Sequence, residues 1–307
     1  MINILMATYN GARYLPEQID SLLRQTEQDF TLYVHDDCSN DGTWALLCEY
    51  AGRYPGKISI CQNEQNSGGA EHNFLQMMAA HRNGYVMLCD QDDVWLPDKI
   101  ERTLKAMRAA EAAYGEATPI LVHTDLYVAD QDLSVVSNSL NDMLALEMDR
   151  TSLASQIVQN TVTGCTAMYN TALAQRIRTP QYCIMHDWWL GLITVCFGRR
   201  VYLPEPTVLY RQHGGNSVGA KKVRSLQYVL RKLFHPQQTF LVREQTYRQT
   251  ADFLRAYEDA LSPAQADLLR DYIRIPSLPR AKRWIELKRL GVLRHSKLRR
   301  LGQFFTV

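Results

Sequence analysis

The sequence lacks several patterns that mark common protein classes. None of its seven cysteines forms a C-x-x-C pair, so neither a zinc ribbon nor a dithiol redox centre is expected. No G-x-G-x-x-G follows the first apolar run and no G-x-x-x-x-G-K occurs, which excludes a dinucleotide fingerprint and a P-loop. The longest apolar stretch, Trp188–Gly198, is about half of the roughly 20 residues that a membrane-spanning helix needs. The N-terminus has no export signal, so we expect a cytoplasmic protein with reduced thiols.

Acidic and basic residues nearly balance over the whole chain but not along it. The net charge is +2, whereas residues 280–300 hold nine Lys or Arg and one Glu, a local +8 that leaves −6 for the rest. Apolar side chains are interleaved with these cations, namely Trp284, Leu287, Leu290, Phe304 and Phe305. We expect residues 276–307 to make a peripheral contact with anionic phospholipid on the inner face of the plasma membrane. A solvated helical face or an oligomer contact is the alternative.

The first 130 residues repeat one pattern, in which an apolar run ends in polar residues and an amphipathic segment follows. The predicted strands are Ile2–Ala7, Phe30–Val34, Ile58–Gln62, Tyr85–Cys89 and Ile120–Val128. The predicted helices are Tyr14–Gln25, Thr43–Tyr54, Ala70–Arg82 and Pro97–Tyr114. This order predicts an α/β fold with a Rossmann-like, mostly parallel sheet flanked by helices. Ligands of such sheets bind beyond the carboxyl ends of the strands.

The alternation loosens after about residue 134. We therefore expect one α/β domain over residues 1–219, with a nucleotide-binding half (1–130) and an acceptor half (131–219). A helical, basic C-terminal extension is expected over residues 220–307. The oligomeric state is left open by the sequence, and nothing in it indicates nucleic-acid binding.

An acidic loop, Asp90-Gln91-Asp92-Asp93, follows the fourth predicted strand and precedes a helix with proline in its first turn. Asp90 and Asp92 can hold Mg²⁺ or Mn²⁺ while phosphate oxygens and water fill the other positions. Such a cation would offset the charge that develops on a departing pyrophosphate. The alternative is a polar loop whose Asp residues cap the next helix.

The loop after the second predicted strand offers a carboxylate for a nucleobase. Asp37 can accept the N3 proton of uracil or thymine, whereas cytosine has no proton there. The neighbouring Ser39, Asn40 and Asp41 are typical of a turn and a helix cap. Thr8, Tyr9 and Asn10 end the first strand and would place backbone groups and a ring beside the base. The segment Asn66-Ser67-Gly68-Gly69 lets a backbone approach a ligand closely.

A second acidic position, Asp187 in M-H-D-W-W, opens an apolar helix. It is the candidate general base, and an N-cap is the alternative role. Trp188 and Trp189 follow it directly, and flat aromatic faces pack well against sugar C–H surfaces, which suggests an acceptor site. Arg211 and His213 lie in a later Gly-rich loop, where a cation or a metal ligand would complete a pyrophosphate site. A structural role is the alternative for this histidine.

Six segments of residues 1–219, taken in order, resemble family 2 of the inverting GT-A glycosyltransferases: A-T-Y-N-G, V-H-D-D-C-S-N-D-G-T, N-S-G-G, D-Q-D-D-V-W-L-P-D, M-H-D-W-W and Y-R-Q-H-G-G-N. Within the family they look most like bacterial rhamnosyltransferases of surface polysaccharide assembly. The chain departs from processive synthases, because the Q-x-x-R-W signature and transmembrane helices of those enzymes are not found.

The resemblance implies a GT-A fold that binds a nucleotide diphosphate sugar and transfers one sugar, with inversion, to a glycan or lipid-linked acceptor. It implies metal ligation chiefly by Asp92, with Asp90 and His213 nearby, and Asp187 as base. The candidate donor-binding residues are Thr8, Tyr9, Asn10, Asp37, Asn66, Gly68, Asn73, Asp90, Arg211 and His213. The donor it suggests is dTDP-β-L-rhamnose, and a UDP-hexose is the alternative. A nucleotidyltransferase and a non-catalytic nucleotide-sugar-binding module remain as more distant alternatives.

Overall fold

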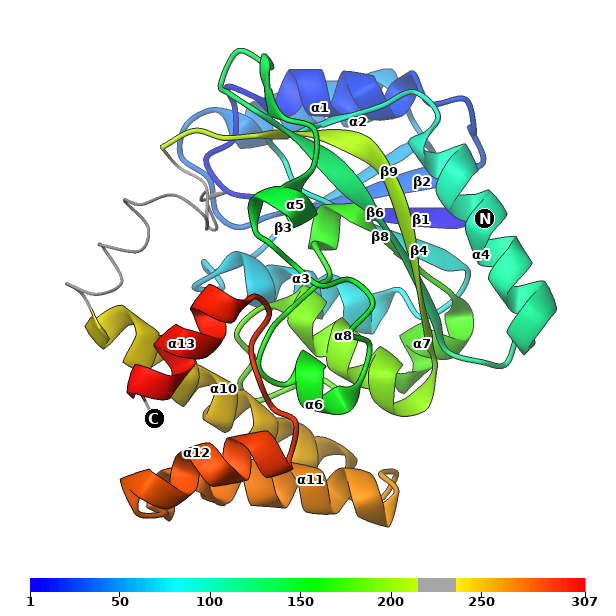
Figure 1. Cartoon of the computed structure of the whole chain (residues 1–307). Helices are drawn as coiled ribbons and strands as arrows, with labels where there is room; N and C mark the ends of the chain where they lie inside the picture. Colours follow the sequence, from blue (N-terminus) through cyan, green and yellow to red (C-terminus); the bar gives the residue numbers. More distant parts are fainter. Residues whose placement is uncertain (215–235, 307) are drawn as a thin grey trace. The chain divides into compact units, whose positions relative to one another are not determined.

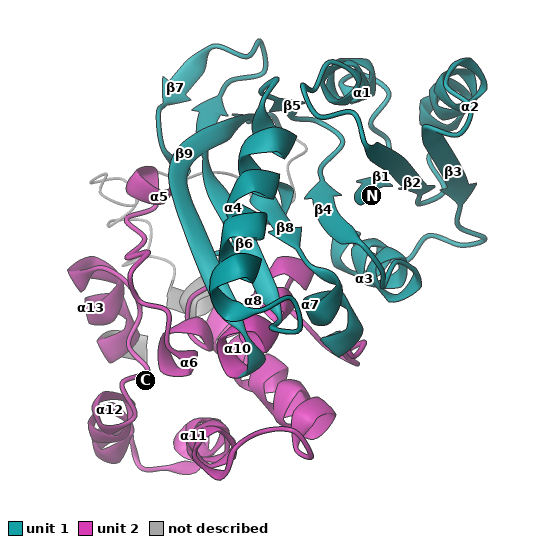
Figure 2. Cartoon of the chain, turned by 90° about the vertical axis from the view of Figure 1, so that its right-hand side faces the viewer, with its two compact units in different colours: residues 1–140, 162–177, 197–220 teal, residues 141–161, 178–196, 221–307 magenta. Residues whose placement is uncertain are grey.

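The computed structural model describes residues 1–214 and 236–306, and the chain forms two compact units (Figure 2). Unit 1 comprises residues 1–140, 162–177 and 197–220, and unit 2 comprises residues 141–161, 178–196 and 221–307. Unit 2 therefore joins the C-terminal region to two segments of the expected acceptor half. The boundary expected at residues 219 and 220 lies outside the described residues.

Unit 1 is built on one nine-stranded sheet with the order β3-β2-β1-β4-β8-β6-β9-β5, and β7 pairs with β6 (Figure 2). Its strands are β1 (Ile2–Thr8), β2 (Phe30–Asp36), β3 (Ile58–Gln62), β4 (Tyr85–Cys89), β5 (Val94–Trp95), β6 (Ile120–Ala129), β7 (Val135–Ser137), β8 (Ala167–Tyr169) and β9 (Arg199–Arg211). The pairs β1–β2, β1–β4, β2–β3 and β6–β9 are parallel. The short strand β8 runs antiparallel between β4 and β6, which makes the sheet mixed. The expected α/β sheet is thus confirmed, with antiparallel additions.

Helices cover the first part of this sheet on both sides. The helices of unit 1 are α1 (Leu15–Leu23), α2 (Thr43–Arg53), α3 (Ala70–Ala80), α4 (Lys99–Tyr114) and α7 (Thr171–Arg176), with the 3-10 turn η1 (Gly164–Thr166). In Figures 1 and 2, α1 and α2 lie on one side of strands β1–β3 and α3 lies on the other. Right-handed crossovers produce this arrangement, because the chain moves outward from β1 to β3 and then returns to β4. Strands β1 and β4 are buried nearly throughout, as their continuous apolar sequences predict.

The register of the parallel strands brings their carboxyl ends to one edge of the sheet. Thr8 at the end of β1 pairs with Asp36 at the end of β2, and Met6 pairs with Cys89 at the end of β4. The loops that follow these three strands therefore leave the sheet side by side. This edge is where a ligand of the sheet is expected.

Unit 2 is helical. Its helices are α5 (Leu140–Met143, of which Leu140 belongs to unit 1), α6 (Leu153–Gln156), α8 (His186–Phe197, of which Phe197 belongs to unit 1), α10 (Pro236–Tyr257), α11 (Pro263–Arg274), η2 (Ile275–Ser277), α12 (Arg280–Arg289) and α13 (Lys297–Thr306). Residues 186–194 of α8 are all buried, as expected for an apolar helix. The buried His295 ring ties the C-terminal region to an earlier segment: its Nδ1 accepts the Glu147 N–H at 2.9 Å, and its Nε2 lies 2.8 Å from Ser155 Oγ.

Candidate active site

The Asp37 carboxylate connects the loop after β2 to the loop after β3. Its Oδ1 accepts hydrogen bonds from Asn63 Nδ2 at 2.8 Å and from the Ser67 N–H at 2.7 Å, and its Oδ2 accepts one from Ser67 Oγ at 2.8 Å. Asn66 Nδ2 donates to the Asp37 carbonyl oxygen at 2.9 Å. The structure therefore brings the predicted residues Asp37, Asn66 and Gly68 into one pair of loops. A carboxylate has about four acceptor sites, so Asp37 retains capacity for one more donor.

Side chains from other loops hold four consecutive N–H groups after β1. The Tyr9 N–H donates to Gln91 Oε1 at 2.9 Å. The next three N–H groups donate to side chains of the loop after β2 and the start of α2. The Asn10 N–H donates to Ser39 Oγ at 2.9 Å, the Gly11 N–H to Thr43 Oγ1 at 2.9 Å, and the Ala12 N–H to Asp41 Oδ2 at 3.1 Å. Asn10 itself adopts a positive φ of 49°, a conformation that asparagine tolerates better than most residues. The loop is thus fixed by the protein, and about half of the Tyr9 side chain is exposed at its tip.

Thr8 and Asn73 have inward-facing partners. Thr8 Oγ1 donates to Asp36 Oδ1 at 3.0 Å, and Asn73 Nδ2 donates to the His35 carbonyl oxygen at 3.0 Å. Both residues are almost completely buried. These predicted donor-binding side chains therefore support the loops beneath the candidate site, which limits any contact with a ligand to what their backbones offer.

Asp92 and His213 meet in the structure. His213 Nε2 lies 2.8 Å from Asp92 Oδ2, and each side chain keeps 15% of its surface exposed. The His213 ring also packs against Tyr14, with the ring centroids 4.6 Å apart. A carboxylate and an imidazole that are in contact and reachable by solvent suit a divalent ion such as Mn²⁺.

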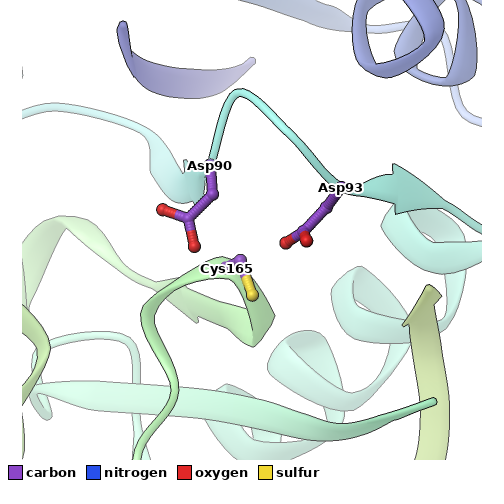
Figure 3. A group of neighbouring side chains, drawn as sticks. All are labelled: Asp90, Asp93 and Cys165. Atoms are coloured by element: carbon purple, nitrogen blue, oxygen red, sulfur yellow. The ribbon is translucent and has the colours of Figure 1, made fainter. Parts of the chain in front are cut away.

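Asp90 lies beside two further potential ligands, Asp93 and Cys165 (Figure 3). One ligand atom of each residue lies within 4.8 Å of the others. Asp93 is fully buried, and its Oδ1 accepts the Arg211 N–H at 3.0 Å. Burial, followed by the charges of Asp90 and Asp92, raises the pKa of Asp93 well above its usual range. Burial likewise raises the pKa of the Cys165 thiol. The partly exposed Asp90 is the member of this group best suited to a hard cation.

Arg211 is placed differently from the prediction that it binds a pyrophosphate. Its guanidinium donates to the carbonyl oxygens of Asp92 at 2.8 Å and Gln131 at 2.6 Å, and it also binds the Glu17 carboxylate. The side chain is 3% exposed and lies over the Tyr14 ring. Because its donors are directed at protein acceptors, Arg211 supports the acidic loop instead of facing a ligand.

The candidate base Asp187 lies in the first turn of α8, within unit 2. Its Oδ1 accepts a hydrogen bond from Asn160 Nδ2 at 2.9 Å, and Gln156 Nε2 donates to Asn160 Oδ1 at 3.2 Å. The amide chain therefore holds Asp187 in one orientation.

The two tryptophans after Asp187 are core residues in the structure, contrary to the expected acceptor site. Trp189 is 0% exposed, and its ring packs edge-on against Phe253 at 5.1 Å between centroids. Its Nε1 donates to the Arg178 carbonyl oxygen at 2.9 Å. Trp188 is also buried, and its Nε1 donates to the Gln156 carbonyl oxygen at 2.6 Å. Because both rings are buried, neither offers a face to a sugar.

Comparison with known proteins places these features in a family. The family model described as glycosyl transferase family 2 matches residues 3–178, which is more than half of the chain. The chain belongs to glycosyl transferase family 2. Among curated relatives of this transferase, the dTDP-rhamnosyl transferase RfbG of Shigella flexneri is 25% identical over 227 residues, covering 70% of this chain and 74% of that protein. The putative teichuronic acid biosynthesis glycosyltransferase TuaG of Bacillus subtilis is 26% identical over 196 residues, covering 63% and 72%.

Solved structures show the same fold as this family 2 transferase. Residues 1–349 of S. aureus TarS align with a TM-score of 0.58 at 18% identity, covering 99% of this chain and 86% of that one. The mannosyltransferase PcManGT from Pyrobaculum calidifontis, in complex with GDP-Man and Mn²⁺, aligns with a TM-score of 0.56 at 15% identity, covering 94% and 72%. The expected GT-A fold is thereby confirmed. Among the described residues, no helix of the transferase is long and apolar enough to cross a membrane.

Sequence reasoning missed several residues that shape the site of this transferase. Gln91 and Asp93 lay inside the motif but were given no role of their own. Glu17 and Tyr14 are contributed by α1 and its start, and they contact Arg211 and His213 about 200 positions later in the chain. Nothing in their local sequence marks such partners, because only the pairing of β9 with β5 and β6 brings the end of β9 to α1.

Proposed function

We propose that this family 2 glycosyltransferase moves one sugar from a nucleotide diphosphate donor to a glycan or lipid-linked acceptor, with inversion at the anomeric carbon. The observation that carries the proposal is the contact of Asp92 with His213 at the edge where the loops after β1, β2 and β4 converge. Asp37 and Tyr9 are proposed to bind the nucleoside. Asp90 and Asp92, with His213, are proposed to hold Mg²⁺ or Mn²⁺. The bound ion would offset the charge of the departing diphosphate.

Asp187 is proposed as the general base. Inversion requires the acceptor hydroxyl to attack opposite the leaving group, and a carboxylate near the anomeric carbon can take its proton. Asn160 Nδ2 donates to Asp187 Oδ1, which helps to fix the orientation of this carboxylate.

The donor that we propose is dTDP-β-L-rhamnose, and the product is then an α-L-rhamnoside of a cell-surface glycan. The name of the RfbG relative supports this choice, and the order of the sequence motifs agrees with it. A UDP-hexose is the second candidate, because Asp37 would recognise the N3 proton of uracil and thymine alike.

A donor panel tests these assignments. With Mn²⁺ present, dTDP-rhamnose, UDP-glucose, UDP-galactose and UDP-N-acetylglucosamine are compared by thermal shift and by slow donor hydrolysis. We expect dTDP-rhamnose to give the largest stabilisation and the fastest hydrolysis. Preference for a UDP-sugar would replace rhamnose, and stabilisation without hydrolysis or transfer would favour a binding module. Release of pyrophosphate from a nucleoside triphosphate would indicate a nucleotidyltransferase.

We also propose that unit 2 binds an anionic bilayer through one face of α12 and α13. Ile285, Leu301 and Phe304 expose 66, 54 and 47% of their surfaces, and apolar side chains grouped on a surface can mark a membrane contact. The Phe304 ring packs edge-on against Trp284 with 4.9 Å between the ring centroids, so aromatic side chains of the two helices are in contact. Lys288 Nζ lies 5.3 Å from the centre of the Trp284 ring. Apolar groups framed by cations suit a surface of anionic lipid headgroups.

Flotation of the full-length chain with phosphatidylglycerol vesicles tests this surface. The double substitution Ile285→Ser, Phe304→Ser is expected to reduce recovery with the vesicles. Leu241→Ser is the matched control, because Leu241 is 65% exposed on α10, outside the proposed surface. Point substitutions are preferable to truncation, since His295 and Arg300 bind Glu147 within unit 2. Equal flotation of wild type and double variant would reject membrane binding through this face.

A further inference from the structure

The side chain of Gln91 binds the backbone of the loop that follows β1. Its Oε1 accepts the Tyr9 N–H at 2.9 Å, and its Nε2 donates to the Tyr9 carbonyl oxygen at 3.0 Å. One amide group thus satisfies both backbone groups of one residue, as a neighbouring strand would. The pairing of β1 with β4 ends at Met6 and Cys89, so Gln91 continues the contact between the two chain segments beyond the ends of the strands.

Gly11 provides the space that Gln91 occupies. A Cβ atom at Gly11 would lie 2.1 Å from Gln91 Oε1 and 2.4 Å from Gln91 Cδ. Gly11 is not among the residues with positive φ, so its backbone conformation does not require glycine. A Cβ atom at this position would therefore displace the end of the Gln91 side chain.

The contact between Gln91 and Tyr9 joins two proposed parts of the donor site. Gln91 stands between Asp90 and Asp92, the proposed metal ligands, and Tyr9 belongs to the proposed nucleoside site. We infer that Gln91 is a positioning residue that fixes the nucleoside loop to the metal loop, so that both ends of one donor nucleotide are bound together. This inference rests on the proposed function. The N–H groups of residues 10–12 bind the loop after β2 and the start of α2, so the link from Tyr9 to the acidic loop is made by Gln91.

A double-mutant cycle tests the inference by titrating dTDP and UDP, each with Mn²⁺, against wild type, Gln91→Ala, Gly11→Ala and the double variant. Each single substitution should weaken nucleotide binding by about 10-fold, because two hydrogen bonds worth roughly 0.5–1.5 kcal/mol each are lost. Gly11→Ala keeps the amide but displaces it from Tyr9. In the double variant the new methyl group meets no amide, so the total loss should stay at about 10-fold instead of the roughly 100-fold expected for independent sites.

Additive losses in this cycle would overturn the inference, and so would unchanged nucleotide binding by Gln91→Ala. The control is Gln76→Ala, since Gln76 is exposed on α3 away from these loops. In transfer assays, Gln91→Ala should raise the KM for donor while kcat at saturating donor is retained, whereas general loss of structure would lower kcat. If wild type binds neither nucleotide, the proposed function fails. The contact between Gln91 and Tyr9 can then still be tested by amide hydrogen exchange, which should be faster at Tyr9 in Gln91→Ala than in wild type. Unchanged exchange at Tyr9 would reject the positioning role of Gln91.

Discussion

His213 Nε2 and Asp92 Oδ2 lie 2.8 Å apart although 121 positions separate the two residues in the chain. The contact joins the acidic loop after β4 to the end of β9. It gives the proposed metal site a nitrogen and an oxygen ligand from different parts of unit 1.

Replacing Asp92 should uncouple nucleotide binding from the metal. Asp92→Asn removes a charged ligand, so dTDP or UDP binding with Mn²⁺ should weaken by at least the roughly 10–100-fold that loss of a supporting partner costs a metal site. Binding without metal should change little. Calorimetric titrations with and without Mn²⁺ measure both quantities. Asp29→Asn, at an exposed position, is the control. Equal losses with and without Mn²⁺ would argue against a metal role for Asp92.

Asp187→Asn should separate binding from turnover. The amide keeps the size of the side chain but cannot take a proton, so turnover should fall by about 10²-fold or more while donor binding is retained. Asn160→Ala should lower turnover less, because it removes one hydrogen bond to Asp187 and leaves the carboxylate in place. Initial rates at saturating donor, together with nucleotide titrations, distinguish the two effects. Substantial transfer by Asp187→Asn would remove this residue from the mechanism.

Arg211→Met should destabilise unit 1. The substitution leaves the carbonyl oxygens of Asp92 and Gln131 without their charged donor, and such losses cost about 3 kcal/mol in free energy of unfolding. Glu17→Gln is the matched comparison, and it should cost much less because the Glu17 side chain is more than half exposed. Urea unfolding at fixed pH measures both variants. Similar costs for the two substitutions would mean that the ion pair, and not the carbonyl contacts, is what Arg211 contributes.

Lys99 should make stability depend on pH in the alkaline range. Burial lowers the pKa of Lys99 from 10.5 to about 8, and its Nζ lies 3.4 Å from Thr207 Oγ1. The unfolded chain therefore binds more protons than the native one between pH 8 and 10.5, so this residue makes stability rise with pH there. The stability of Lys99→Met should not rise with pH in this range. The variant should therefore be most stable relative to wild type below pH 8, and this difference in free energy of unfolding should shrink above pH 8. A difference that stays constant with pH would contradict this.

Local sequence was enough to predict the elements that carry their own apolar pattern. The strands that became β1–β4 and the helices that became α1–α4 agree with the structure to within a few residues, because each carries its own apolar periodicity. Strand β9 was not predicted. Its residues are only partly buried and are held by pairing with β6 and β5, which local pattern does not reveal.

The candidate site was predictable in its residue types more than in its contacts. The acidic loop and Asp37 were recognisable from their positions after strands. The roles of Arg211 and Trp189 were not recognisable. The same residue types at these positions are compatible with ligand binding and with the buried protein contacts that the structure shows. The roles of Arg211 and Trp189 depend on hydrogen-bond acceptors and aromatic rings that distant segments of the chain supply.

Neither compact unit is a continuous stretch of polypeptide, for the chain passes from one unit to the other at residues 140/141, 161/162, 177/178, 196/197 and 220/221. A gene rearrangement with a single crossover therefore cannot exchange one unit for that of another transferase and leave the other intact. Chimeras of this enzyme with its relatives should accordingly be joined at several of these positions at once.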